Sequence, residues 1–175
     1  MATSQIAFDF DQTKAIETIL YLAKRISRSD KYNICKMLYL ADKTSLERYG
    51  RFIFGESYSA MQQGATPSES YDILKRIGKE SSDDLCVDGN AVVALRDANL
   101  DYLSESDIEC LEQTIAIYDK NPRKMYDDAH DDAWGKAWES RKGGKRSTAI
   151  PVKSIAQTLA NSRDLIDYLT NRGVE

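Results

Sequence analysis

The residues best suited to catalysis or metal binding surround the single histidine of this sequence. His130 stands in a run that also holds four carboxylates, Asp127, Asp128, Asp131 and Asp132. On a helix, residues four apart are neighbours, so two pairs of these carboxylates could share a face beside the imidazole. Because carboxylates bind hard cations and imidazole binds transition metals, a metal site is one interpretation.

The alternative interpretation of this run is a solvated acidic face in the N-terminal half of a helix, where the helix dipole favours negative charge. The segment supplies no second pair of ligands that would close a metal site. We therefore expect neither a metal nor a cofactor.

His130 is also the only imidazole available to activate a nucleophile. The nearest cysteine in sequence is Cys110, but nothing in the spacing brings its thiol to the imidazole, and buried cysteines are common in cores. The segment 55–59 lacks the final glycine of a nucleophile elbow, and Gly143-Gly144-Lys145 lacks the strand and spacing of a phosphate-binding loop. We predict that the protein is not an enzyme and assign no catalytic residues; the enzymatic alternative is a hydrolase using His130 and the nearby acids.

Two tryptophans follow His130 at intervals of four residues, at Trp134 and Trp138. This spacing predicts one helix with the three rings along a single face. An aromatic stripe at helical spacing is typical of a core. We therefore expect a packed, hydrogen-bonded imidazole rather than a reactive one.

Basic residues offer little support for nucleic-acid binding. Residues 141–147, RKGGKRS, form a glycine-rich loop without the interleaved aromatics on which bases stack. The basic residues between Lys24 and Lys31 fall near a helix end, where cations are favoured in any case. We expect no nucleic-acid partner.

Length and composition predict one globular domain. The chain has 175 residues, of which 42% are hydrophobic and 30% charged, and its net charge is −4. The charge is unevenly distributed: residues 81–132 contain 14 acids and 4 bases, and the remainder contains 14 acids and 20 bases. A basic partner should therefore prefer 81–132, and an acidic partner the other face.

No membrane or secretory signal is visible in the sequence. The longest apolar runs are five residues, far below the roughly 20 needed to span a membrane. The three cysteines, Cys35, Cys86 and Cys110, form no close pair and suit free thiols in a reducing compartment. We expect a cytoplasmic protein.

Apolar residues at intervals of three and four predict several amphipathic helices. Three short polar residues stand where helix N-caps are expected, at Thr13, Asp30 and Thr66, and a fourth helix should begin near Ser104. In the third helix, Pro67 and Glu69 complete the capping pattern. The second helix should end at Gly50 and the third at Gly78, and a last helical region should run from about 152 to 171.

Two segments have β character. Residues 51–63 are rich in aromatic and branched side chains, which favours short extended segments. Asp88-Gly89-Asn90 separates two apolar runs and predicts a β-hairpin. The expected fold is mainly α (α+β): a single compact helical domain over 1–175 with a small antiparallel β element, and with 139–175 as a C-terminal helical extension.

A series of motifs is specific in its order and spacing. It comprises Leu38-Tyr39-Leu40-Ala41-Asp42, then Gly50, Ile53-Phe54-Gly55, Tyr58, Ala60 and Met61, then Gly64, Pro67 and Tyr71, and finally His130-Asp131-Asp132-Ala133-Trp134. The series resembles the Panacea domain, the SocA-like antitoxin domain of bacterial and phage toxin–antitoxin loci. One departure is that the turn has Gly64-Ala65-Thr66-Pro67 where the family usually has Gly-Pro.

The resemblance implies a non-enzymatic protein that neutralises a cognate protein toxin by direct binding. Aromatic and methionine side chains suit interface anchors. The expected partner-binding residues are Tyr58, Met61, Gln62, Gln63, Ser68 and Tyr71, each of which could equally be core. Motif residues for which we expect a structural role are Tyr39, Asp42, Gly55, Pro67, His130 and Trp134.

Two other roles remain open at this point. The resemblance to SocA itself implies a delivery adaptor that hands a toxin to a AAA+ protease. The third role is an interaction protein of a phage or prophage that counters host defence.

Overall fold

The computed structural model describes residues 5–172. Its elements are, in order, α1 (Gln12–Arg25), α2 (Lys31–Tyr49), β1 (Tyr58–Met61), β2 (Gly64–Pro67), α3 (Ser68–Ile77), β3 (Leu85–Asp88), β4 (Ala91–Ala94), a 3-10 turn η1 (Leu100–Tyr102), α4 (Glu105–Lys120), α5 (Pro122–Asp128), α6 (Asp132–Ser140), β5 (Ser147–Ile150), α7 (Val152–Ala156) and α8 (Ser162–Asn171). The prediction of a mainly helical fold with a small antiparallel β element is confirmed.

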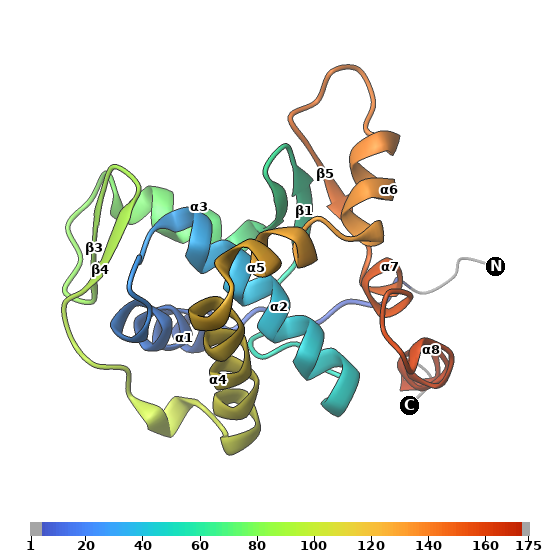
Figure 1. Ribbon diagram of the computed structural model, residues 1–175, viewed down its shortest axis with the longest axis horizontal. Coiled ribbons are helices and arrows are strands. Elements are labelled where there is room, and N and C mark those ends of the chain that lie inside the picture. Colours follow the sequence, from blue (N-terminus) through green and yellow to red (C-terminus); the bar gives the residue numbers. More distant parts are fainter. Residues whose placement is uncertain (1–4, 173–175) are drawn as a thin grey trace.

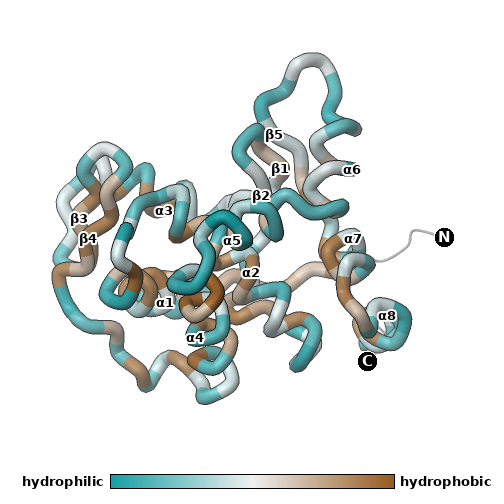
Figure 2. Tube along the Cα trace, viewed as in Figure 1, coloured by the Kyte–Doolittle hydropathy of each residue, from teal (hydrophilic) through white to brown (hydrophobic). Residues whose placement is uncertain are grey.

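Helix α2 runs through the middle of the fold and contacts α1, α3, α4, α5, α7 and β2 (Figure 1). Its residues from Ile34 to Asp42 are all buried, so this helix has no polar outer face over that stretch. Hydrophobic residues also concentrate along α1 and the hairpin strands, whereas the loop between α6 and β5 is mostly hydrophilic (Figure 2).

The β structure consists of two small antiparallel sheets. The hairpin β3–β4 forms around Gly89, as the sequence predicted. The other sheet has the strand order β2-β1-β5, and in it Tyr58 pairs with both Pro67 and Ile150. The sequence did not predict strand β5, which lies between the predicted loop at 141–147 and the last helical region of the C-terminal extension 139–175; residues 173–175 lie outside the described part.

One of the three predicted helix caps is confirmed, at Asp30, and so is the predicted start of a helix near Ser104. Asp30 accepts a hydrogen bond from the Asn33 amide, and Ser104 forms a reciprocal capping box with Asp107. The prediction for Thr13 is wrong, because α1 begins two residues earlier than expected and Asp11 caps it.

The cap predicted for α3 is also wrong. Thr66 lies within β2, and Pro67, at the N-cap position, makes no side-chain cap. The Glu56 carboxylate instead accepts hydrogen bonds from the Glu69 and Ser70 amides, both at 3.0 Å. The amide donors at the start of α3, which the local sequence pattern assigned to Thr66, are therefore bound by Glu56, a residue more distant in sequence.

The segment around His130 is not one helix. Helix α5 ends at Asp128, and α6 begins at Asp132 with Asp131 as its N-cap. His130 therefore lies in the connection, which corrects the prediction of a single helix carrying His130 and Trp138. The last helical region is likewise divided, into α7 and α8.

Gly55 allows the N-terminal segment to cross the chain after α2. It has φ +74°, and a Cβ added there would lie 1.8 Å from the Asp9 carbonyl oxygen. The Asp11 amide donates to the Phe54 carbonyl at 2.9 Å in the same place. Both the left-handed backbone and the close approach require glycine.

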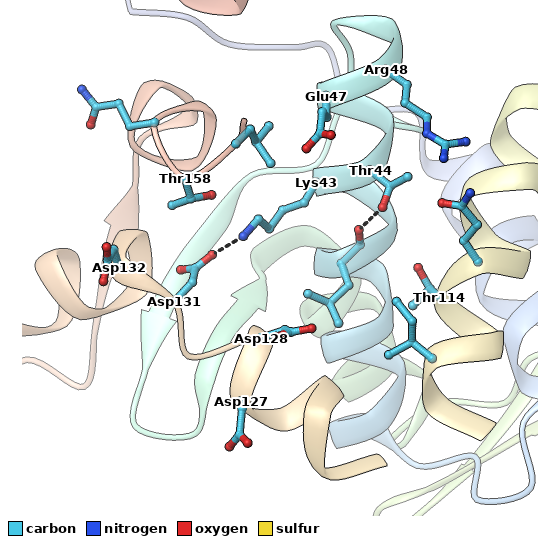
Figure 3. A pocket seen from close by; sticks show the side chains of 15 residues that line it. Lys43, Thr44, Glu47, Arg48, Thr114, Asp127, Asp128, Asp131, Asp132 and Thr158 are labelled. Carbon is cyan, nitrogen blue, oxygen red and sulfur yellow. Dashed lines mark hydrogen bonds and ion pairs between the residues drawn. The ribbon is translucent and has the colours of Figure 1, made fainter. Parts of the chain in front are cut away.

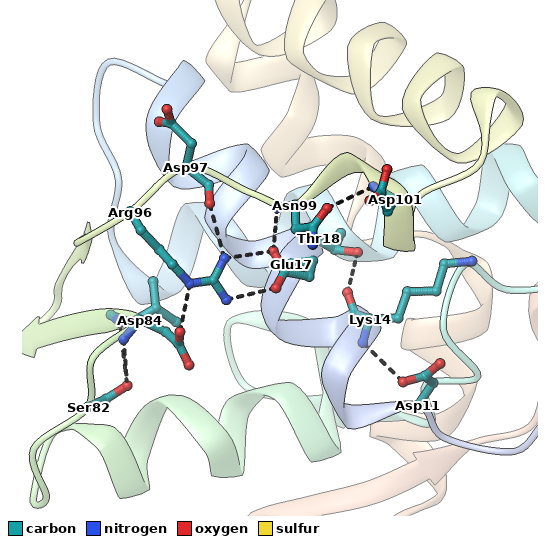
Figure 4. Close-up of polar contacts among 11 residues, drawn as sticks. Asp11, Lys14, Glu17, Thr18, Ser82, Asp84, Arg96, Asp97, Asn99 and Asp101 are labelled. Atoms are coloured by element: carbon teal, nitrogen blue, oxygen red, sulfur yellow. Dashed lines mark hydrogen bonds and ion pairs between the residues drawn. The ribbon is translucent and has the colours of Figure 1, made fainter.

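Buried ion pairs join α1 to the segments around it. The Glu17 carboxylate is bound by the Arg96 guanidinium through both oxygens, and Arg96 also binds Asp84 (Figure 4). Bidentate binding by arginine holds the pKa of Glu17 below its usual value. Within residues 5–172 no helix is both long and apolar enough to cross a membrane.

Candidate partner-binding grooves

Two grooves open on different faces of α5. The lysine groove has a volume of about 1040 Å³, and its lining includes Tyr32, Lys36, Met61, Gln63, Tyr71 and Tyr126. The aspartate groove has a volume of about 700 Å³, and its lining includes Lys43, Asp127, Asp128, Asp131, Asp132 and Thr158. Helix α2 contributes its N-terminal part to the first groove and its C-terminal half to the second.

Four of the six predicted partner-binding residues come together in the lysine groove. Met61, Gln62 and Gln63 belong to the tight turn between β1 and β2, and Tyr71 comes from the first turns of α3. Gln62 and Gln63 are exposed, and Met61 and Tyr71 are half-buried. The hairpin turn and the start of α3 face the N-terminal part of α2 across this groove.

Tyr58 and Ser68 do not reach the groove. Tyr58 is only 3% exposed and packs edge-on against Tyr39. Its hydroxyl donates to Asp42 at 2.7 Å, so Tyr58 is a core residue and the expectation of an exposed anchor is wrong. Ser68 is half-buried and its hydroxyl lies 2.8 Å from that of Ser59.

Asp42 is a buried carboxyl held by two donors. The Ile53 amide donates to one oxygen at 2.8 Å and the Tyr58 hydroxyl donates to the other. Burial raises its pKa to about 7, despite these two bonds. Asp42 therefore joins α2 to β1 and to the segment that precedes β1. Pro67, at the end of β2, is the strand partner of Tyr58.

Lys36 lies at the floor of the lysine groove. It is only 2% exposed, and its ammonium donates to the Ala65 carbonyl at 2.9 Å. The ammonium also lies 5.1 Å from the centre of the Tyr32 ring. Burial lowers the pKa of Lys36 to about 8.

A column of aromatic rings borders this groove. Tyr32 stacks on Tyr126, Tyr126 on His130 at 4.2 Å, and His130 meets Trp134 edge-on. Trp138 continues the column by stacking on Trp134. The Trp134 indole donates to the Met61 carbonyl at 2.7 Å, which ties α6 to the end of β1.

The His130 ring is held in one orientation. Its Nδ1 lies 2.8 Å from the Tyr126 carbonyl, and because a carbonyl only accepts, Nδ1 carries a proton. Its Nε2 is buried and has no hydrogen-bond partner. A Cβ on Gly64 would lie 2.9 Å from the His130 ring and 3.1 Å from the Lys36 ammonium, so glycine allows β2 to approach both.

In the aspartate groove three of the acidic side chains, Asp127, Asp128 and Asp131, pair with cations. Asp131 accepts from the Lys43 ammonium at 2.8 Å (Figure 3). It also accepts from the Tyr39 hydroxyl at 2.7 Å. Its other oxygen accepts from the Trp134 amide and caps α6. Asp127 pairs with Arg123 and Asp128 with Lys124, each one helical turn apart.

The sequence-level candidates for chemistry do not assemble into a reactive site. Burial raises the pKa of the Cys110 thiol to about 11, so it is protonated at neutral pH. Within the described residues, no three His, Cys, Asp or Glu side chains gather closely enough to hold a metal ion.

Comparison with known families decides the relationship of this chain. The family described as antitoxin SocA-like, Panacea domain, matches residues 34–135. The chain belongs to this family. Comparison with curated proteins and with solved structures gave no significant match.

Membership of the SocA-like Panacea family indicates an antitoxin-type role and suggests a non-catalytic, regulatory protein. The matched segment contains β1, β2, α3 and α5 whole and most of α2, and therefore most of the lysine groove. Most of the aspartate groove also lies inside it, except for Gln157, Thr158 and Leu159, which follow α7, so the family match does not distinguish the two grooves.

Tyr32 and Lys36 are two of the groove residues that were not among the predicted partner-binding residues. Both are placed there by α2, and Lys36 stands between Cys35 and Met37 in an otherwise apolar stretch. A lysine inside an apolar run is the signal that could have indicated a functional position, since buried lysines are rare.

Proposed function

We propose that this chain is an antitoxin-type protein that neutralises a cognate protein toxin by direct binding, and that the toxin occupies the lysine groove. The family match supports the antitoxin role. The convergence of Met61, Gln62, Gln63 and Tyr71 on one groove is the observation that carries the choice of surface.

The composition of the groove suits a protein partner. Aromatic rings and methionine provide apolar contact area, and the exposed amides of Gln62, Gln63 and Asn90 can bond a partner's backbone. The groove is supported from beneath by the aromatic column and by the Trp134 bond to Met61, so its shape is held before binding.

Co-expression tests the proposal. The product of a gene adjacent to this one should arrest growth when expressed alone, and this chain should restore growth. If no adjacent product is toxic alone and rescued by this chain, the proposal fails.

A matched pair of variants tests the surface. Gln63 in the lysine groove and Gln157 in the aspartate groove are both exposed glutamines. Gln63→Trp should abolish rescue by filling the groove entrance, and Gln157→Trp should leave rescue intact. Loss of rescue with Gln157→Trp but not with Gln63→Trp would assign the toxin-binding site to the aspartate groove.

The half-life of the toxin in the co-expressing cells distinguishes direct blocking of the toxin from delivery of the toxin to a protease. Direct neutralisation predicts that the half-life of the toxin is unchanged or longer when this chain is present. A toxin that disappears faster in protease-proficient cells, and not in cells lacking the AAA+ protease, would favour the adaptor role instead.

A further inference from the structure

Lys36 is a buried cation that no carboxylate of the described residues accompanies, and it makes fewer hydrogen bonds than buried Asp42 and Glu56, whose carboxylates each accept two or more. Buried Glu17 binds Arg96, and buried Asp107 binds both Lys14 and Arg51. Within residues 5–172, no carboxylate lies within ion-pair distance of Lys36, and its one hydrogen bond is to a carbonyl. An ammonium has three donors, so two N–H groups have no acceptor in this site.

Two further polar groups beside Lys36 are also without partners. The Tyr32 hydroxyl and the His130 Nε2 atom are buried and make no hydrogen bond. Tyr32 lies beneath the Lys36 ammonium, and His130 and Lys36 both border Gly64. A buried polar atom without a partner costs free energy, so the free donors of Lys36 and Tyr32 favour a ligand that accepts hydrogen bonds, whereas His130 Nε2, with the proton on Nδ1, is an acceptor and gives no support to an anion.

The charge of the surrounding groove is positive. Arg28 and Lys31 line it together with Lys36, and Asp30 is the acid among the lining residues. Asp30 is already engaged, because it accepts from the Asn33 amide at 2.7 Å and pairs with Arg28 at 3.0 Å. The groove therefore favours an anion at its floor.

We propose that the floor of the lysine groove binds a side-chain carboxylate from an acidic segment of the protein partner, with Lys36 as its counter-ion and the Tyr32 hydroxyl as a second donor. This inference rests on the proposed function for the identity of the partner. It names the chemistry that the partner must present at this groove.

The structure favours a carboxylate over a phosphate as the anion. One buried ammonium matches the single negative charge of a carboxylate, and a phosphate dianion would leave a charge uncompensated. The walls are aromatic and amide side chains, which suit a peptide. An Asp or Glu side chain entering a groove of about 1040 Å³ can bring a carboxylate to the floor while its backbone stays at the rim.

The pKa of Lys36 provides a readout of this contact. Burial holds it at about 8. A carboxylate bound at the ammonium favours the charged form and raises this pKa. A merely structural lysine would show no such response.

Nuclear magnetic resonance of the lysine side chains in the wild-type chain tests the proposal. The probe is an acetylated, amidated oligoglutamate peptide, compared with inorganic phosphate and an oligolysine peptide at constant ionic strength. We expect saturable shifts at Lys36, Tyr32 and His130 with oligoglutamate, and a rise of about one unit or more in the pKa of Lys36. Saturable binding of phosphate without binding of the peptide, or no saturable shift with any probe, would overturn it.

A matched pair of lysine variants sharpens the result. Lys36→Met should weaken oligoglutamate binding about tenfold or more, the usual effect of losing a charge-assisted hydrogen bond. Lys136→Met removes an exposed lysine of α6 outside the groove and should change affinity less than about twofold. Equal losses in both variants would mean general charge attraction and would overturn the site. If Lys36→Met does not fold, the wild-type titration still decides.

The growth assay separates this inference from the proposed function. Rescue by Lys36→Met as efficient as that by the wild-type chain leaves toxin neutralisation standing and removes the carboxylate site. Lys36-dependent peptide binding without rescue of any toxin leaves the site standing and removes the proposed function.

Discussion

The lysine groove and the aspartate groove share α2 and α5 but differ in how their charges are compensated. At the aspartate groove, Asp127, Asp128 and Asp131 each pair with a lysine or arginine of this chain. At the lysine groove, among the residues that the structure describes, a carbonyl is the only acceptor for Lys36, and the Tyr32 hydroxyl has no partner. The first set of charges stabilises the fold, and the second is available for a partner.

This difference corrects a simple interpretation of the charge distribution. Residues 81–132 are strongly acidic, which suggested a docking surface for a basic partner. The acids at the end of that segment are largely occupied by intramolecular ion pairs. Compensated charges contribute less to recognition than an uncompensated buried one.

The largest expected effect is a loss of stability when a paired carboxylate of the aspartate groove is removed. Asp131→Ala removes the cap of α6 and the partner of both Lys43 and Tyr39. We expect a loss of about 2–4 kcal/mol in the free energy of unfolding, measured by denaturant titration. Asp132→Ala, an exposed neighbour, is the control and should cost less than about 0.5 kcal/mol. Equal small losses would show that Asp131 is not structural.

The pH dependence of stability should identify Lys36 as the uncompensated charge. Its pKa is about 8 in the folded chain, against an ordinary value of 10.5 for lysine, so the unfolded chain binds more protons between these values. Stability should therefore rise with pH, by about 2 kcal/mol between pH 7 and 9.5. The titratable groups facing Lys36 are Tyr32 and Cys35 of α2, Tyr126 of α5 and His130; strand β2 contributes none.

Lys36→Met should remove this rise, and the difference between the two pH profiles isolates Lys36 from other titrating groups. The profiles are measured by urea unfolding at each pH. Parallel profiles would show that Lys36 is not held with a lowered pKa.

Groove contacts should affect partner affinity without affecting stability. Met61→Ala should weaken toxin binding about tenfold, because a half-buried methionine on the groove wall loses its contact with the partner. Thr158→Ala in the aspartate groove is the control and should change affinity less than about twofold. Isothermal titration calorimetry with the purified toxin measures both. The opposite order would assign the toxin to the aspartate groove.

The smallest expected effect is on the stability of Lys36→Met at pH 7. Removing an uncompensated buried charge is favourable, whereas the loss of the bond to Ala65 is unfavourable. We expect the two to offset within about 1 kcal/mol in chemical denaturation. A loss above about 3 kcal/mol would show that Lys36 is part of the structural core, like Asp131.

Local patterns in the sequence predicted the elements whose determinants are local. The cap at Asp30, the helix start near Ser104 and the hairpin at Gly89 depend on residues within a few positions of each other. Strand β5 was missed because its pairing partner is β1, almost 90 residues earlier in sequence. The cap of α3 was missed for the same reason, since Glu56 reaches it from another segment.

The candidate site could be predicted in part. Motif spacing indicated Met61, Gln63 and Tyr71, and the fold places them around one groove. It could not show that Tyr58 faces inward, because this depends on pairing with Asp42. Motif spacing also could not show that Lys36 lies at the groove floor. All residues of α2 from Ile34 to Asp42 are buried, so helical periodicity does not indicate which of them borders a groove.

Site-specific photo-crosslinking tests the central claim most directly. A photo-reactive amino acid is placed at Gln63 in the lysine groove or at Gln157 in the aspartate groove, and the chain is co-expressed with its toxin and irradiated. We expect a covalent adduct with the toxin from position 63, mapped to an acidic segment, and none from position 157. An adduct from position 157 alone would contradict the assignment of the toxin to the lysine groove.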